Sequence, residues 1–429
     1  MDISTTKLLI NYLLRVSRMI VIKQPRRLAR LRRLALSAQG LLQTNAFGQG
    51  RVGALNAINH LGYVQIDTIS VVERAHHHVL SARVPNYYPQ MLNELLRSGD
   101  VFEYWSHAAA FLPIADYRFS LPYKKAIKQG QVHWYKDTDA KLMSELLARI
   151  TIDGPLKSRD LENDTVKRGL WWDCKPAKKA LEQLYMQGDL MVSHRQGFQK
   201  SYDLTERVLP SHINTNVPSA EEYAVHMLDQ QLRCHGLISL KGITYLRKNL
   251  PLRHAVKQLV AQRLADKTLE QVELSNKDVF LVEAGALERR LLNVNKHMQI
   301  LSPFDNSVIQ RDRLKSLFEY DYKIECYVPA IKRQYGYFCL PLLYRARFVG
   351  RIDCKAHRKD KHLEIKALFF NELANPSVNN TDMDELIHAF VAALPNFMRF
   401  QQCHSVSLTK AFPELIMQKV RNELKQLEL

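Results

Sequence analysis

Two polar residues two positions apart, Gln65 and Asp67, carry the most suggestive chemistry in this sequence. They lie in the run 63–69, where residue types alternate with a period nearer two than 3.6, and this alternation predicts an extended segment. In an extended chain, residues i and i+2 point to the same face, whereas in a helix they would diverge by about 200°. The pattern therefore predicts a carboxamide and a carboxylate side by side.

A carboxylate beside a carboxamide suits the hydrolysis of an N-glycosidic bond. Asp67 would deprotonate the attacking water and offset the positive charge that develops on the sugar, and Gln65 would orient that water. The simpler alternative is a pair of strand-end residues that only form local hydrogen bonds. Gln-x-Asp by itself does not distinguish the two, because the pattern is short and common.

The elements around this pair belong to a first lobe, which we place at residues 34–137. Apolar residues at helical spacing predict a helix over 52–61, and Gly62 ends it. A second helix is expected at 89–97 and a strand at 101–105, where strand-forming residues concentrate. Within this lobe His77, Glu103 and His107 are candidates to line the cleft that would contain Gln65 and Asp67, or to support those two residues.

Residues 138–212 follow the plan of a winged helix-turn-helix, in which three helices precede a two-stranded hairpin. The expected elements are helices at 140–149, around 160 and at 176–187, and strands at 190–193 and 200–204. The third helix and the hairpin carry basic residues suited to phosphate contacts, namely Lys175, Lys178, Lys179, Arg195 and Lys200. The alternative is that this module serves as a spacer or a protein-interaction domain.

The rest of the chain divides into two further segments. Residues 213–295 contain a third helical set, with helices at 221–235, 240–248 and 252–267, and form another winged unit on one interpretation. Residues 296–429 contain closely spaced strands followed by terminal helices, which predicts a β-barrel-like domain. The fold class is therefore α+β, with tandem winged helix-turn-helix domains and a C-terminal barrel-like domain.

The charge of the chain points to a polyanionic partner. The sequence holds 61 Lys and Arg against 43 Asp and Glu, a net charge of +18, which favours nucleic acid first. Residues 1–33 carry nine basic side chains and one acidic residue, Asp2. This basic N-terminal extension has three explanations: an arm for phosphates, a targeting peptide, or a poorly structured extension that includes a start codon placed too far upstream.

Other classes of protein and site find little support. The longest apolar runs, such as 389–394, are far shorter than the ~20 residues that cross a bilayer. Six scattered cysteines argue against a disulfide scaffold or a zinc site and indicate a reducing cytoplasm. The run His76-His77-His78 offers no convergent ligand set, so we expect no metal. Lys124 and Lys125 leave a lysine nucleophile open, although nothing singles out either one.

Several longer segments, in order along the chain, resemble the winged-helix DNA glycosylases of the AlkZ and YcaQ family. The resemblance covers about residues 34–409, and the Gln-Ile-Asp motif with the block Tyr335-Gly336-Tyr337-Phe338 favours the YcaQ branch. The segments are 62–77 with Leu80, Arg83 and Tyr87; 103–108; 171–176; 301–305; and 332–338 with Leu340 and Pro341.

This resemblance implies tandem winged-helix domains around a DNA channel, with Gln65 and Asp67 in the catalytic motif. It implies a monofunctional glycosylase that removes N-alkylated purines such as N7-alkylguanine and unhooks interstrand crosslinks, without a cofactor. We expect a monomer that acts on double-stranded DNA in the cytoplasm, at the nucleoid. A noncatalytic winged-helix regulator of transcription is the alternative, since most winged helices bind DNA without chemistry. An RNA-binding or membrane-surface protein has less support, because the strands lack aromatic stacking residues.

Overall fold

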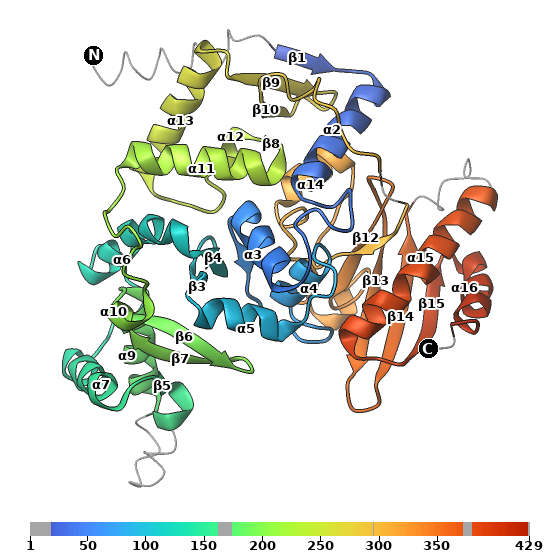
Figure 1. Ribbon diagram of the computed structural model, residues 1–429. Helices are drawn as coiled ribbons and strands as arrows, with labels where there is room; N and C mark the ends of the chain where they lie inside the picture. Colours follow the sequence, from blue (N-terminus) through green and yellow to red (C-terminus); the bar gives the residue numbers. More distant parts are fainter. Residues whose placement is uncertain (1–18, 162–173, 295, 372–379, 428–429) are drawn as a thin grey trace. The chain divides into compact units, whose positions relative to one another are not determined.

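The chain folds into two compact units in the computed structural model (Figure 1). Unit 1 combines Met1–Tyr88 with Ala224–Leu429, and unit 2 is Pro89–Tyr223. The structure describes residues 19–161, 174–294, 296–371 and 380–427, without the side chains of residues 174, 175, 380 and 381. The two units cut across the predicted domain boundaries because residues near the N-terminus pair with residues more than 200 positions later.

A mixed four-stranded sheet forms the first part of unit 1. Its strands lie in the order β1-β9-β10-β8, with β1 parallel to β9 and the other pairs antiparallel. The strands are β1 (Met19–Ile22), β9 (Leu269–Leu274), β10 (Val279–Glu283) and β8 (Leu237–Ile238). Helices α2 (Pro25–Ala38), α11 (Ala220–His235), α12 (Leu240–Ile243), α13 (Leu250–Ala265) and α14 (Arg311–Phe318) complete it.

Residues 19–33 differ from the predicted basic extension, because they form β1 and most of α2. Leu31 and Leu34 are buried on the inner face of α2, and arginines on its other faces bond to backbone carbonyls. Arg32 Nε donates to the Leu317 carbonyl oxygen at 2.7 Å, and Arg33 Nη2 donates to that of Leu292 at 2.7 Å. The sequence did not predict this amphipathic helix, because the many arginines obscure its apolar periodicity. The basic residues before position 19 lie outside the described residues.

The C-terminal part of unit 1 is a five-stranded sheet in the order β11-β12-β13-β14-β15. The described residues do not form the predicted barrel, because β11 and β15 are the two edges of an open sheet. Parallel pairing of β14 with β15 requires a long crossover, and α15 supplies it and buries Ile387 and Phe390 in the sheet's core. The elements are β11 (Gln299–Ile300), β12 (Cys339–Tyr344), β13 (Arg347–His357), β14 (His362–Phe370), β15 (Ser405–Phe412), α15 (Asn380–Gln401) and α16 (Met417–Leu424).

Unit 2 begins with α5 (Pro89–Arg97) and the antiparallel hairpin of β3 (Val101–Trp105) and β4 (Ala109–Pro113). Between residues 140 and 204 the predicted first and third helices and the hairpin are present, together with a short strand, β5 (Leu156–Lys157), that the sequence did not predict; the predicted helix around residue 160 lies partly outside the described residues. The elements are α7 (Ala140–Asp153), β5, α9 (Cys174–Met186), β6 (Leu190–Gln196) and β7 (Gln199–Leu204), with the strands in the order β5-β7-β6. Short helices η1 (Ile114–Ser120), α6 (Leu121–Lys128) and α10 (Thr205–Val208) complete the unit.

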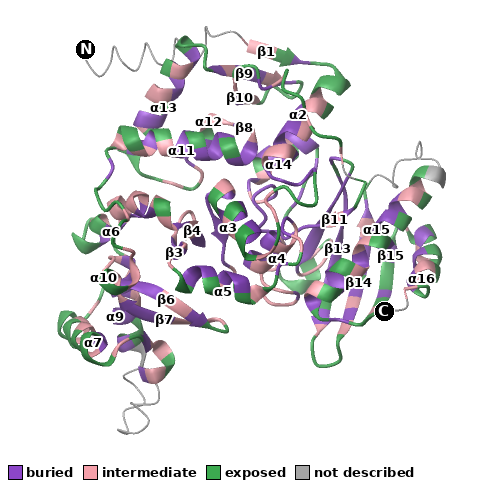
Figure 2. Cartoon of the chain, viewed as in Figure 1, coloured by how far each residue is buried: buried purple, intermediate pink, exposed green. Residues whose placement is uncertain are grey.

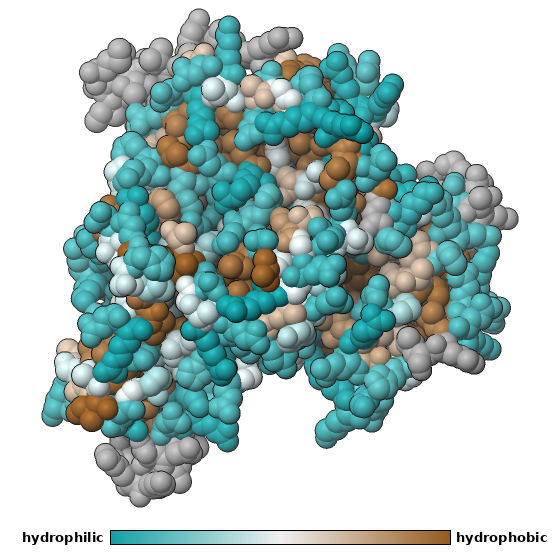
Figure 3. All heavy atoms as spheres, in the orientation of Figure 1, coloured by the Kyte–Doolittle hydropathy of each residue, from teal (hydrophilic) through white to brown (hydrophobic). Residues whose placement is uncertain are grey.

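Burial follows these elements closely. Every residue of β12 is buried, and Figure 2 shows the same for the inner parts of the neighbouring strands. Hydrophilic side chains cover most of the face drawn in Figure 3. In the described parts of the chain, no helix combines the length and the apolar character needed to span a bilayer.

Candidate active site

Gln65 ends the short strand β2 (Val64–Gln65), and Asp67 lies in the irregular segment that follows. Strand β2 is therefore shorter than the predicted extended run 63–69, and its last residue lies two positions before Asp67. Gln65 is buried, at 8% exposure, whereas Asp67 is only half-buried. Asp67 Oδ1 accepts a hydrogen bond from the backbone N–H of Ile69 at 2.8 Å, a local turn that fixes the carboxylate.

The electrostatics of Asp67 suit a base. Burial raises the pKa of its carboxyl group, and the Ile69 N–H offsets only part of that rise. Among the described residues Asp67 forms no ion pair, so its negative charge is not neutralised by a fixed cation. A carboxylate with this environment is more basic than an ordinary aspartate and retains its charge for a developing cation.

Helix α3 (Gly50–Leu61) delivers the chain to β2. Gly62 ends the helix in the left-handed conformation with φ +77°, and its N–H donates to the Ile58 carbonyl at 2.8 Å. A Cβ at this position would lie 2.2 Å from Gln230 Nε2, so any other residue would also have to displace that side chain. Asn306 Nδ2 then donates to the Tyr63 carbonyl at 3.1 Å, which fixes the chain two residues before Gln65.

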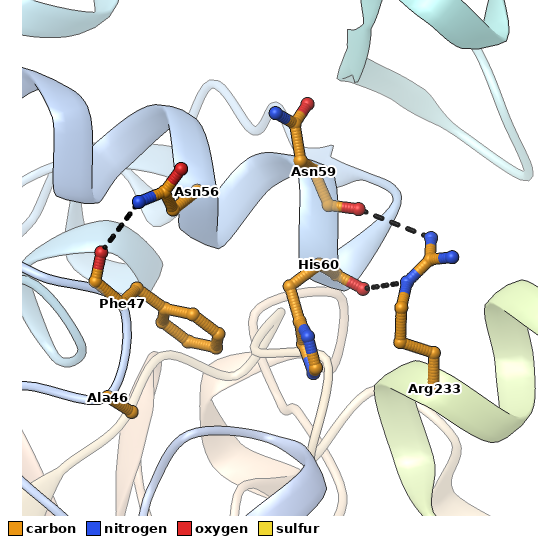
Figure 4. A pocket seen from close by; sticks show the side chains of 6 residues that line it. All are labelled: Ala46, Phe47, Asn56, Asn59, His60 and Arg233. Carbon is orange, nitrogen blue, oxygen red and sulfur yellow. Dashed lines mark hydrogen bonds between the residues drawn. The ribbon is translucent and has the colours of Figure 1, made fainter.

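A cavity of about 530 Å³ lies beside the end of α3 (Figure 4). Its polar side chains serve mainly to satisfy the helix end: Arg233 donates from Nη2 to the Asn59 carbonyl and from Nε to the His60 carbonyl, both at 3.2 Å. His60 Nε2 lies 2.6 Å from the Ala38 carbonyl oxygen. The last carbonyls of a helix lack intrahelical partners, and a cation is well placed there. We therefore assign these contacts to positioning β2. The cavity is lined by Ala46, Phe47, Asn56, Asn59, His60 and Arg233.

The segment after Asp67 is held by the C-terminal part of unit 1. Arg358 donates from its two Nη atoms to the carbonyls of Ser70 (2.8 Å) and Val72 (3.0 Å). The Ala356 N–H donates to the Val71 carbonyl at 2.8 Å. Each partner lies more than 280 residues away in sequence. The five-stranded sheet thus fixes the segment that carries the candidate base.

Helix α4 (Ala75–Ser81) contains the histidine run, and its three members have different surroundings. His77 is half-buried with Nδ1 2.7 Å from the Tyr87 hydroxyl, whereas His76 and His78 are buried. His78 Nε2 lies 2.8 Å from the Ile300 carbonyl oxygen, and burial lowers its pKa to about 4, which keeps it neutral. No group of three metal-ligating side chains occurs within the described ranges.

A fully buried ion pair holds α4 against the segment that supports β2. Arg83 Nη1 donates to Asp305 Oδ2 at 2.6 Å and Nη2 donates to Oδ1 at 2.9 Å, and neither side chain is exposed to solvent. Arg83 Nε also donates to the Gln39 carbonyl at 2.8 Å. Burial alone would raise the pKa of Asp305, but Arg83 and Ser307 outweigh it and hold the pKa below its ordinary value.

Three of the predicted residues in unit 2 form one buried cluster. Glu103 is fully buried, and its carboxylate accepts hydrogen bonds from Arg195 Nε and Nη2 at 2.8 and 2.9 Å. Lys200 Nζ lies 2.6 Å from the same carboxylate, and its side chain is 24% exposed. These three residues therefore form a structural ion cluster within unit 2. His107 is half-buried in the turn between β3 and β4.

Helix α9 carries the remaining predicted phosphate ligands. Lys178 and Lys179 are exposed, and Lys179 Nζ lies 5.9 Å from the centroid of the Tyr135 ring. The side chain of Lys175 and the segment 162–173 lie outside the described residues. Contact of these lysines with DNA stays a prediction.

The architecture and the sequence both match known DNA glycosylases. The family model "DNA glycosylase AlkZ-like" matches residues 58–393, more than three-quarters of the chain. The chain belongs to the AlkZ-like DNA glycosylase family. Its structure is similar to that of the Streptomyces sahachiroi DNA glycosylase AlkZ, with a TM-score of 0.58 and 14% sequence identity over 90% of this chain and 100% of that chain. The family resemblance is confirmed, while the assignment to the YcaQ branch stays a prediction.

Sequence reasoning missed the residues that position the Gln65–Asp67 motif of this AlkZ-like glycosylase. Gln230, Asn306 and Arg358 reach the segment 62–72 from positions 168 to 288 residues away. Local spacing holds no signal for such contacts. The segment 301–305 is the partial exception, because its resemblance to the family marked the neighbourhood of Asp305 and Asn306 without assigning a role.

Proposed function

We propose that this AlkZ-like glycosylase hydrolyses the N-glycosidic bond of N-alkylated purines, N7-alkylguanine above all. Asp67 acts as general base and as stabiliser of the sugar cation, and Gln65 orients the water. The observation that carries the proposal is the half-buried Asp67 carboxylate, whose pKa is raised by burial and which has no cationic partner in the described parts of the chain. Its charge acts most strongly where the oxocarbenium ion develops.

The chemistry of the leaving group explains why one carboxylate and one amide suffice for base excision. Alkylation at N7 makes the guanine base cationic, so the base departs without a strong general acid. The enzyme must supply an activated water and a negative charge near the anomeric carbon, and one basic carboxylate with one amide meets both needs. General acid–base catalysis of this kind contributes about 10²–10⁴-fold to a rate.

We extend the proposal to interstrand crosslinks. A crosslinked base remains attached to the opposite strand and cannot be turned into a closed pocket. Asp67 is half-buried and Thr68 is exposed, so the candidate base lies at the surface of unit 1 rather than in a sealed cavity. This exposure suits a substrate that must remain part of the duplex.

The reaction proceeds without a lysine nucleophile in our proposal. Lys124 is buried at 3% exposure, with Nζ 3.9 Å from the centroid of the Tyr117 ring and 4.6 Å from that of Tyr104. The aromatic rings surround its amine and hinder approach of a deoxyribose. Borohydride reduction during turnover should therefore trap no covalent complex between enzyme and DNA, whereas a lysine Schiff base would be trapped.

The deciding experiment incubates the protein with a duplex that contains one N7-methylguanine and measures alkali-labile abasic sites under single-turnover conditions. Wild type should produce them, and Asp67→Asn should lower the rate by about 10²–10⁴-fold. Asp266→Asn is the matched control, because Asp266 is an exposed carboxylate of unit 1 at the end of α13. Binding without base release by wild type would favour the noncatalytic regulator.

Lys178 and Lys179 supply nonspecific affinity in this proposal. Replacing both by alanine should weaken binding to damaged and undamaged duplexes alike and reduce the dependence of affinity on salt, since each phosphate contact contributes about 0.9 to the logarithmic slope. If the salt dependence of DNA binding were unchanged in this variant, Lys178 and Lys179 would not belong to the DNA-binding surface.

A further inference from the structure

Unit 1 presents two exposed apolar side chains on one loop near Asp67. In the loop 326–333, Tyr327 is 77% exposed and Ile331 is 94% exposed. Single exposed apolar residues are common on protein surfaces and require no explanation. This loop differs because of its rigid anchoring, its charge and its position beside the candidate base.

The position follows from packing on a shared core. Ile69, two residues after Asp67, and Ile324, three residues before Tyr327, both pack against the hydrophobic cluster beneath the five-stranded sheet. With at most ~3.6 Å per residue, neither Asp67 nor Tyr327 can lie far from that cluster. Burial, and next to it the Asp67 charge, raises the pKa of the Cys326 thiol, so the carboxylate lies within electrostatic range of the loop.

The loop is closed at its base by one carboxylate. Glu325 accepts hydrogen bonds from the backbone N–H groups of Gln334 at 2.9 Å, Tyr335 at 2.7 Å and Gly336 at 3.1 Å. Burial alone would raise the pKa of Glu325, but these three donors outweigh it and lower the pKa, so the carboxylate stays ionised. Inside the loop, Arg333 Nε donates to the Val328 carbonyl at 2.9 Å. A loop ordered in advance loses little entropy on binding.

The outer surface of the loop has the charge of a nucleic-acid ligand site. Lys323 and Lys332 are exposed, and Arg333 is half-buried with its guanidinium 4.9 Å from the centroid of the Tyr337 ring. Among residues 323–333 the one acidic residue, Glu325, is buried and turned toward the backbone, and the exposed Asp321 just before them pairs with Lys315. An exposed aromatic ring flanked by cations is the combination that binds unstacked bases.

We propose that the loop 326–333 contacts the duplex at the damaged nucleotide, with the Tyr327 ring stacked on a neighbouring base and Ile331 packed against the adjacent base step. This inference rests on the proposed function, because it takes damaged DNA as the ligand of the site. Its role is positioning: the loop replaces stacking that the distorted duplex has lost and holds the sugar near Asp67. Base stacking on an aromatic side chain corresponds to about 5- to 150-fold in affinity.

The test compares binding to two duplexes that differ only in one tetrahydrofuran abasic analogue. By fluorescence anisotropy at fixed salt, wild type should prefer the abasic duplex. Tyr327→Ala should lose about 5- to 150-fold in affinity for that duplex with little change for the intact one, and Tyr327→Phe should retain the preference. Leu415→Ala is the control, because Leu415 is 66% exposed on another part of unit 1.

The outcomes separate this inference from the proposed chemistry. If wild type releases N7-methylguanine and Tyr327→Ala binds both duplexes as wild type does, the stacking proposal fails and the glycosylase activity stands. An equal loss for both duplexes also overturns it, since the ring would then contribute only nonspecific affinity. If no base is released but the abasic preference depends on Tyr327, the contact stands and the proposed chemistry fails. Circular dichroism of each variant excludes misfolding as the cause.

Discussion

The buried pair of Arg83 and Asp305 gives the sharpest quantitative prediction. Arg83→Met removes a guanidinium whose five N–H groups all have acceptors, and leaves the Asp305 carboxylate sealed at 0% exposure. Breaking a buried pair by removing one partner costs about 3–5 kcal/mol. The carbonyl oxygens of Gln39 and Val79 also lose donors, which keeps the expected loss at the upper end of that range.

The double variant Arg83→Met/Asp305→Leu tests the physical reason. An apolar pair of similar volume avoids the cost of an unpaired buried charge, and such replacements are often neutral or stabilising relative to the ion pair. We therefore expect the double variant to be more stable than Arg83→Met alone, with a coupling of about 1–3 kcal/mol. Ser307, which donates to Asp305 from both N–H and Oγ, limits the recovery because it loses its acceptor.

Urea unfolding followed by two probes gives the assay. All four tryptophans lie between residues 105 and 172, in unit 2, so tryptophan fluorescence is the internal control for a change confined to unit 1. Because a chain of two units need not unfold in one step, amide hydrogen exchange on α4 and on residues 302–310 gives the local free energy. The reasoning would be refuted if Arg83→Met lowered the free energy of unfolding by less than about 1 kcal/mol. It would also be refuted if the double variant lost as much unfolding free energy as the two single variants together.

Three further predictions follow from the ionisable groups. The excision rate should fall as pH drops through the pKa of Asp67, with a midpoint above the ordinary value for aspartate because burial raises that pKa; a rate independent of pH through this range would contradict its role as base. Burial lowers the pKa of Lys124 to about 7, so the unfolded chain binds the proton more tightly than the folded chain does. The free energy of unfolding of wild type, relative to that of Lys124→Met, should therefore rise by about 1.4 kcal/mol per pH unit from about pH 7 toward pH 10. Tryptophan fluorescence measures this change. Glu103→Gln should destabilise unit 2 by about 3–5 kcal/mol in urea, because Arg195 and Lys200 would lose their shared anion; a loss as small as that of a surface substitution would show that the cluster contributes little.

The sequence determined most of the local structure. Helix α3 begins two residues before the predicted start and ends at Gly62 as expected, since apolar spacing and a left-handed glycine act within a few residues. The hairpin of β6 and β7 and the position of α9 were likewise predicted. The Gln-x-Asp spacing is also local and is read directly from the sequence, whereas the placement of the two side chains on one face stays a prediction.

Long-range contacts were decided only by the tertiary structure. Residues 19–22 form strand β1 because strand β9, about 250 residues later, pairs with them, and no local pattern encodes such a partner. The ion pairs of Glu103 with Arg195 and Lys200 of the β6–β7 hairpin likewise join residues about 90 positions apart, and the sequence did not predict them. The depth at which Asp67 lies, and hence its basicity, depends on burial by residues far away in sequence. Composition and spacing identify the chemical groups, whereas folding sets the dielectric environment that gives those groups their reactivity.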